Sequence, residues 1–183
     1  MIPHEVPAPG PAADFAHALA RHLPVLETER LRLRAPRLED FPAWAEILCG
    51  PAGPYLGGPF TRDEAFTEFT ANVGLWLLRG YGTWAVETQD EALLGFVLLG
   101  FEAGDREPEL GFLFTPAAEG QGFAYEAAVA ARDHAVQVLR LPGLVSYTDP
   151  ENARANRLAE RLGARREEDF DGAHVWRHAG GRA

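Results

Sequence analysis

The chain has 183 residues, enough for one domain with a sizeable hydrophobic core. Its composition, with 46% hydrophobic and 24% charged residues, is typical of a globular protein and excludes a disordered one. The formal net charge of −10 disfavours nucleic-acid binding, because a phosphate backbone requires a basic surface. An acidic surface suits a cationic substrate such as an amine, although acidic surfaces also serve solubility alone.

The sequence lacks the features of a membrane or secreted protein. No apolar run approaches the ~20 residues of a membrane span. The first residues contain neither the basic region nor the apolar region of a signal peptide. The single cysteine, Cys49, cannot form an intrachain disulfide. We therefore expect a cytoplasmic protein with no membrane partner.

The composition along the chain suggests three parts. Residues 1–24 form a proline- and alanine-rich extension with a short helix at residues 14–21, which Pro24 ends. Residues 25–179 are expected to form a single domain, and residues 180–183 a loose C-terminus.

The first elements of the domain follow from local patterns. Leucines alternate with arginines at residues 27–34, which predicts a half-buried strand. Asp40 precedes residues 41–48, which have helical periodicity, and is expected to cap that helix. Thr61 and Glu64 have the spacing of a capping box, which predicts a second helix after residue 61.

Strands and helices then interleave. The patterns predict strands at residues 81–87, 93–101, 109–114, 144–148 and 173–178, and helices at residues 123–139 and 152–162. The first two of these strands are expected to form a hairpin. Because hairpins and strand–helix units both occur, the fold class is α/β with a mixed sheet.

The most informative segment is residues 109–127, where a strand leads through a glycine-containing loop directly into a helix. Gly120 and Gly122 allow backbone N–H groups to point at an anion at the helix N-terminus, where the helix dipole is positive. This pattern predicts a pyrophosphate site. A dinucleotide-binding motif is excluded because its third glycine is absent, and a Walker A loop because Gly-Lys-Ser/Thr is absent. A plain glycine turn is the alternative for Gly-x-Gly alone.

The surroundings of the loop favour the binding site. Glu119-x-x-Gly122-x-Ala124 resembles the Gln/Arg-x-x-Gly-x-Gly/Ala motif of the GNAT acetyltransferase superfamily. Residues 28–34 resemble its first strand in the branch that includes ribosomal-protein N-terminal acetyltransferases. Residues 82–97 resemble its second and third strands, and residues 149–164 its late strand-to-helix segment. The four segments occur in the family's order.

The resemblance implies a GNAT-like fold, a central mixed twisted sheet that is splayed between its fourth and fifth strands, with helices on both faces. It implies acetyl-CoA as cosubstrate, no metal, and transfer of acetyl to a primary amine by direct attack in a ternary complex. The acceptor is a peptide N-terminus or a small-molecule amine, and a homodimer is compatible with the sequence. The alternative is a non-catalytic acyl-CoA-binding or regulatory module, because Ala155 and Ala159 replace the hydroxyl residues of relatives.

The resemblance also assigns residues to coenzyme A. The pantetheine arm is expected along the fourth strand and the pyrophosphate on the loop. The expected binding residues are Phe112, Leu113, Phe114, Gly120, Gln121, Gly122, Phe123, Ala124, Asn152 and Asn156. Asn152 could equally be a helix N-cap. Glu119 departs from the family's Gln, Arg or Trp and would repel phosphates, so Arg154 and Arg157 are candidates to supply positive charge.

Two residues are expected to be catalytic. Glu109, at the head of the fourth strand, is placed by the resemblance beside the thioester and could accept the amine's proton; a solvated strand end is the alternative. Tyr147 could protonate the leaving thiolate if its side chain faces the cleft, and a packing role is the alternative. A backbone amide near Phe112 or Leu113 is expected to stabilise the oxyanion.

Overall fold

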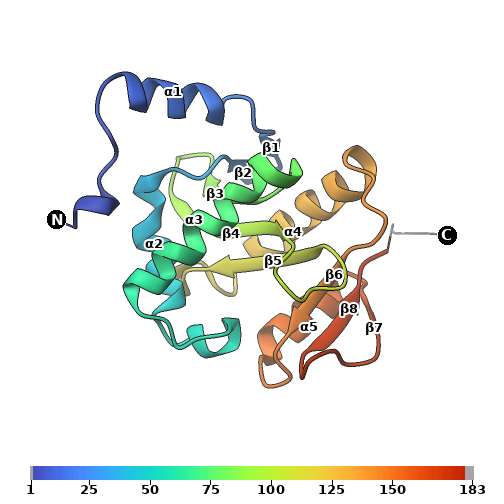
Figure 1. Ribbon diagram of the computed structural model, residues 1–183. Coiled ribbons are helices and arrows are strands. Elements are labelled where there is room, and N and C mark those ends of the chain that lie inside the picture. The colour runs from blue at the N-terminus through green and yellow to red at the C-terminus, as the bar shows by residue number, and fades with distance from the viewer. Residues whose placement is uncertain (1, 180–183) are drawn as a thin grey trace.

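The computed structural model describes residues 2–179, so the predicted loose C-terminus at residues 180–183 lies outside the described residues. Within that range, eight strands form one sheet in the order β1-β2-β3-β4-β5-β6-β8-β7 (Figure 1). The strands are β1 (Leu26–Glu27), β2 (Leu31–Arg34), β3 (Thr83–Thr88), β4 (Leu93–Gly100), β5 (Glu109–Phe114), β6 (Val145–Thr148), β7 (Arg165–Arg166) and β8 (His174–Arg177). Neighbouring strands are antiparallel except β5 and β6, which are parallel. The predicted mixed sheet is confirmed.

Helices cover both faces of the sheet. They are η1 (Pro3–Glu5), α1 (Pro11–Ala20), η2 (Leu38–Asp40), α2 (Phe41–Leu48), η3 (Gly53–Leu56), α3 (Arg62–Arg79), η4 (Pro116–Ala118), α4 (Phe123–Asp133), η5 (His134–Val138) and α5 (Ala153–Arg161). Helices α2 and α3 pack on one face, and α4 and α5 on the other. Helix α1 runs along one edge of the molecule and buries no residue (Figure 1). Among residues 2–179, no helix combines the length and apolarity needed to cross a membrane.

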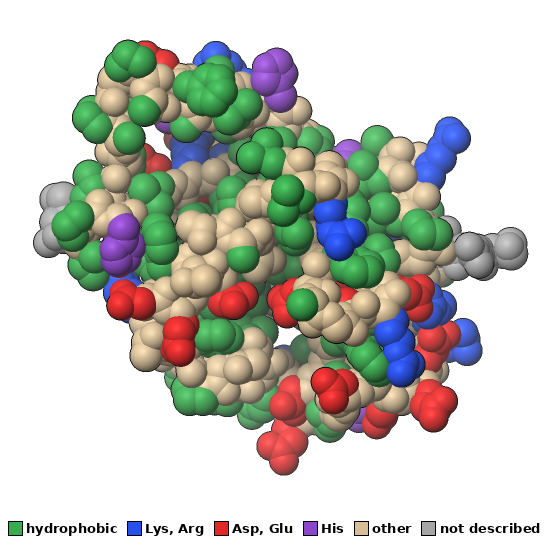
Figure 2. Space-filling view, in the orientation of Figure 1, with side chains coloured by type: hydrophobic (Ala, Val, Ile, Leu, Met, Phe, Trp, Pro, Cys, Tyr) green, Lys and Arg blue, Asp and Glu red, His purple; other side chains and the backbone are tan. Residues whose placement is uncertain are grey.

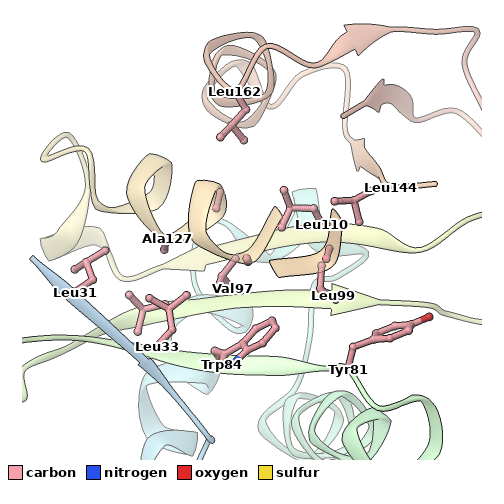
Figure 3. Close-up of a cluster of buried hydrophobic side chains, with 14 of the residues drawn as sticks. Leu31, Leu33, Tyr81, Trp84, Val97, Leu99, Leu110, Ala127, Leu144 and Leu162 are labelled. Atoms are coloured by element: carbon pink, nitrogen blue, oxygen red, sulfur yellow. The ribbon is translucent and has the colours of Figure 1, made fainter. Parts of the chain in front are cut away.

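Two hydrophobic clusters hold these layers together. On one face, Ala127 of α4 lies over the strands that carry Leu31, Val97 and Leu110, and all four residues are fully buried (Figure 3). The cluster on the other face joins α2 and α3 to the sheet through Phe41, Trp44, Ala45, Ile47, Leu48, Ala65, Phe69, Ala85, Phe96 and Leu113. Because β3, β4 and β5 each contribute residues to both clusters, the register of these central strands is fixed from both sides.

Helix α3 begins as predicted. The Thr61 hydroxyl accepts a hydrogen bond from the Glu64 N–H (3.3 Å), and the Glu64 carboxylate accepts one from the Thr61 N–H (2.8 Å). The capping box is therefore confirmed. The helix predicted at residues 123–139 also forms, but α4 ends at Asp133 and residues 134–138 continue as a π-helical turn.

Arg34 and Asp40 differ from the sequence-based prediction. The strand predicted at residues 27–34 is two strands, β1 and β2, and Arg34 is buried with 7% exposure. Its guanidinium donates to both oxygens of Asp40 (2.8 and 2.9 Å) and to Glu87 (2.6 Å). The prediction that Asp40 caps α2 is wrong, because its carboxylate binds Arg34 and the Arg37 N–H (2.7 Å) instead.

Arg34→Met is expected to lower the free energy of unfolding by ~3–5 kcal/mol, since it leaves the buried Asp40 carboxylate without its cation and Glu87 with Arg32 alone. Guanidinium chloride denaturation at neutral pH measures the effect. Arg165→Met is the control, because it removes an arginine from an ion pair at the surface, where the side chain is 73% exposed. An equal loss in the two variants would contradict a stabilising role for the buried network.

Candidate active site

The sheet opens between β5 and β6, which pair only at Glu109 and Val145. The Val145 N–H donates to the Pro108 carbonyl (3.0 Å), as in a regular parallel ladder. The next rung would join the Tyr147 N–H to the Leu110 carbonyl. Instead, the Ser146 hydroxyl donates to that carbonyl (2.6 Å), and the Tyr147 N–H donates to Glu109 Oε1 (3.3 Å). Two side chains thus replace the ladder. The strands separate where the splay was predicted, because β5 and β6 are the fourth and fifth strands of the sequence-based prediction.

Alternate residues of β5 point their backbone N–H and C=O groups into this opening. The Leu110 carbonyl faces β6, whereas the Thr115 N–H donates to Leu94 beside β5 on the other side (3.0 Å). Because successive residues of a strand point their N–H and C=O groups to opposite sides, Phe112 and Phe114 face β6 and Leu113 faces β4. Leu113 is also 8% exposed, with its side chain in the core. Of the two amides predicted for the oxyanion, the Phe112 amide alone faces the opening.

The loop after β5 ends in an uncapped helix N-terminus. Gly120 (φ 74°) and Gly122 (φ 80°) adopt the left-handed conformation that favours glycine. Gly122 immediately precedes α4, and among the described residues no side chain caps this helix. The first intrahelical bond runs from the Glu126 N–H to the Gly122 carbonyl (3.1 Å). The N–H groups of Phe123, Ala124 and Tyr125 consequently have no intrahelical acceptor, and the positive end of the helix dipole lies here.

Glu119, the departure from the family motif, forms an ion pair with Arg154 at the start of α5. This pair joins the loop to α5 across the wide end of the opening, and it neutralises the carboxylate that would repel phosphates. One of the two arginines expected to serve phosphates is therefore bound to Glu119. The other, Arg157, lines a pocket of ≈550 Å³ between α5 and β8.

The two asparagines of the late segment have local structural roles. Asn152 Oδ1 accepts a hydrogen bond from the Ala155 N–H (3.1 Å), so this side chain is the N-cap of α5. Asn156 Oδ1 accepts from the Thr148 hydroxyl (2.8 Å) and the Trp176 indole (3.0 Å), and its Nδ2 donates to the Asn152 carbonyl (2.9 Å). Asn156 thus ties β6, β8 and α5 together.

Glu109 lies at the narrow end of the opening. Burial raises the pKa of its carboxyl to about 8; the hydrogen bond from Tyr147 opposes this shift, and the nearby charges of Glu102 and Asp105 add to it. Glu109 is therefore a partly buried carboxyl that gains and loses its proton near neutral pH. This environment differs from the solvated strand end that was the alternative.

Tyr147 lies beside Glu109, and both side chains interact with the charge of Asp105. The Tyr147 ring packs against Phe170 (6.0 Å between centroids), which the Arg106 guanidinium covers (3.9 Å). Burial raises the pKa of the Tyr147 hydroxyl. The packing role is thus observed, and the residue also lies at the narrow end of the opening.

Sequence reasoning missed the buried pair formed by Ser146 and His178. His178 is 1% exposed, and its Nε2 lies 2.9 Å from the Ser146 hydroxyl. Because that hydroxyl donates to Leu110, we assign the shared proton to His178 Nε2. Burial holds the pKa of His178 down at about 4, with Arg132 adding to the shift, so the ring is neutral. No signal in the sequence links two residues so far apart.

Comparisons with known proteins agree with this geometry. The family model described as "Acetyltransferase (GNAT) domain" matches residues 30–165. The chain is similar to the acetyltransferase from Agrobacterium tumefaciens str. C58, with 34% identity, a TM-score of 0.81, and coverage of 85% of this chain and 94% of that one. It is also similar to the uncharacterized N-acetyltransferase YnaD of Bacillus subtilis (strain 168), with 27% identity over 79% of this chain and 85% of that protein.

The ribosomal L7/L12 α-N-protein acetyltransferase RimL, solved in complex with coenzyme A, shares the fold. Its TM-score is 0.68 at 18% identity, covering 85% of this chain and 97% of that one. The chain therefore belongs to the GNAT acetyltransferase family, as the sequence motifs predicted.

The raised pKa of Glu109 predicts a pH-dependent contribution to stability. The native state holds this proton up to about pH 8, whereas the unfolded chain releases it near its ordinary value of 4.5. The carboxyl's contribution is therefore fully present below pH ~4.5 and is lost as the pH rises to ~8. Relative to the native protein, Glu109→Gln should become progressively more stable across this range in urea denaturation. A stability difference that does not change with pH would contradict the raised pKa.

Proposed function

We propose that this acetyltransferase transfers acetyl from acetyl-CoA to a primary amine by direct attack in a ternary complex. The observation that carries the proposal is the wedge-shaped opening between β5 and β6. A helix N-terminus with free amides lies at its wide end, and a carboxyl with a pKa of about 8 lies at its narrow end. These are an anion site and a proton acceptor, joined by an unpaired strand edge.

The main chain fits coenzyme A. Phe112 and Phe114 present backbone N–H and C=O groups to the opening, and an extended pantetheine arm can bind them as an added strand would. The pyrophosphate would bind the amides of Gly120, Gln121, Gly122, Phe123 and Ala124 at the start of α4. RimL, which has the same fold, carries coenzyme A and supports this assignment.

A primary amine fits as the acceptor. The surface is hollowed between the half that carries α2 and α3 and the half that carries α5, and acidic side chains are numerous around and below the hollow (Figure 2). Two further carboxylates, Glu102 and Asp105, lie close enough to Glu109 for their charges to raise its pKa. Such a surface attracts an ammonium group. The acceptor class comprises peptide N-termini and small-molecule amines.

We assign one residue to each step of the proposed reaction. Glu109 takes the proton of the ammonium, directly or through a water, so that the free amine can attack the thioester carbon. The Phe112 amide faces the opening and stabilises the negative charge that develops on the carbonyl oxygen. As the tetrahedral intermediate collapses, Tyr147 donates a proton to the departing sulfur and regains one from the attacking nitrogen, which loses its second proton. Expelling a thiolate of pKa ~8.5 costs only about 2 kcal/mol at pH 7, so this last role is small.

Gly122→Val should abolish measurable coenzyme A binding in calorimetry, because a branched side chain blocks close approach of an anion to the loop and opposes the φ of 80°. Gly163→Val is the matched control. Gly163 also has a positive φ (75°) and borders helix α5, with open space around it. Equal coenzyme A affinity in Gly122→Val and the native protein would show that the pyrophosphate does not bind this loop.

Glu109→Gln should change the pH profile of kcat/KM for an alkyl amine of pKa ~10.4. Below pH ~8, the base-assisted rate rises tenfold per unit with the carboxylate fraction, and it levels off above that pH. The Gln variant should be slower at pH 7 and should keep rising through pH 8 with the fraction of free amine. Free-thiol release measures both profiles. If the profile of the Gln variant also levels off near pH 8, the group that titrates there is not Glu109.

A further inference from the structure

Arg30, in the turn just before β2, contacts the loop that connects β5 to α4. Its Nη1 donates to the Gln121 carbonyl (3.1 Å), and its Nε donates to Glu126 Oε2 (2.7 Å). The guanidinium stacks over the Phe123 ring at 4.7 Å. One side chain thus holds the residue before Gly122, the first residue of α4 and a residue in the first turn of α4.

The bond to Gln121 has a consequence for the amide of Gly122. In a trans peptide the carbonyl and the following N–H point in opposite directions. When Arg30 fixes the Gln121 carbonyl on its own side, the Gly122 N–H is directed to the opposite side of the loop. A Cβ on Gly122 would lie 3.5 Å from Arg30 Nη2, so the guanidinium lies close behind this peptide.

The bond to Glu126 removes a charge conflict. A carboxylate in the first turn of α4 would repel an anion bound at the same helix end. Glu126 Oε1 accepts hydrogen bonds from the Thr28 hydroxyl (2.6 Å) and the Arg30 N–H (2.9 Å), while Oε2 binds the guanidinium. Partial burial raises the pKa of Glu126, but these hydrogen bonds outweigh burial and hold the pKa below its ordinary value. The group therefore stays an anion, and Arg30 balances its charge.

We propose that Arg30 is a positioning residue for the pyrophosphate of the cosubstrate: it aims the loop amides at the anion and neutralises Glu126 behind them. This inference rests on the proposed function, since it deepens the role of the same loop. Arg30 need not touch the phosphate to act. A lysine can replace it only in part, because a single ammonium does not reproduce the planar fork that holds a carbonyl and a carboxylate together.

The test compares a ligand that contains the pyrophosphate with one that lacks it. Arg30→Met should weaken coenzyme A binding by about 10-fold or more, the effect expected from losing charge-assisted hydrogen bonds. Binding of pantetheine, measured at millimolar concentration, should stay unchanged. Arg30→Lys should recover only part of the coenzyme A affinity. Isothermal calorimetry measures both ligands, and thermal unfolding checks that each variant is folded.

Arg32→Met is the matched control. Arg32 lies two residues further along, on β2, with similar side-chain exposure (41% against 46% for Arg30), and it pairs with Glu27 (3.3 Å) and Glu87 (3.5 Å), away from the loop. Its coenzyme A affinity should match that of the native protein. Equal losses for coenzyme A and pantetheine in Arg30→Met, or no loss for either, would overturn the positioning role.

The two proposals fail in different ways. If Gly122→Val binds coenzyme A as the native protein does, the loop is not the pyrophosphate site and the proposed function loses its anchor. If Gly122→Val loses binding while Arg30→Met retains it, the loop stands and the inference about Arg30 is wrong.

Discussion

The structure depends on one constraint: β5 and β6 share a single residue pair before they separate. A continuous ladder here would close the sheet and leave no main chain available to a ligand. The separation leaves the edge of β5 beyond Leu110 unpaired and places the loop before α4 at its wide end. It also puts Glu109 at the narrow end, where burial raises the pKa of the carboxyl to about 8. The unpaired edge of β5 and the raised pKa of Glu109 are consequences of the same break.

Breaking a ladder inside a protein leaves backbone groups that need other partners. Here side chains supply them, since Ser146 takes the Leu110 carbonyl and Glu109 takes the Tyr147 N–H. His178 supports Ser146 from behind, and Asn156 fixes the end of β6 to α5 and β8. These polar side chains stabilise the open form of the sheet. The opening is therefore a specified feature of the fold and does not require a bound ligand to hold it apart.

The elements that the sequence predicted well are those set by neighbours along the chain. Strand β5 has the predicted bounds, the Thr61 capping box forms, and the loop glycines adopt the left-handed conformation that suits the motif. The burial of Arg34 was not predicted, because a partner far along the chain decides it. Arg34 alternates with leucines as an exposed residue would, yet Glu87, 53 residues away, helps to bury it.

The same distinction holds within the site. The sequence assigns Phe112, Leu113 and Phe114 alike to the ligand. The sheet register decides that the backbone N–H and C=O groups of Leu113 face β4 and not the opening. Arg30 reads as one of several arginines on a strand, and its contact with Glu126 spans 96 residues. Asn152 could be a ligand or a cap, and the observed bond to the Ala155 N–H fills the capping role. The Asn152 cap is a local contact and was one of its two predicted roles, whereas the contacts that orient Leu113 and Arg30 join distant parts of the chain and have no signature in a single sequence.

The proposed chemistry gives a physical reason why α5 can lack a hydroxyl. Ala159 is fully buried, so a larger polar group there would have to enter the core. The groups that exchange protons are instead matched in pKa: Glu109 at about 8, an α-amine at ~8 and a thiol at ~8.5. Each transfer among them costs less than ~1 kcal/mol, whereas taking a proton from an alkyl ammonium of pKa ~10.4 onto Glu109 costs ~3 kcal/mol. A strong acid on α5 adds little to such a sequence of transfers.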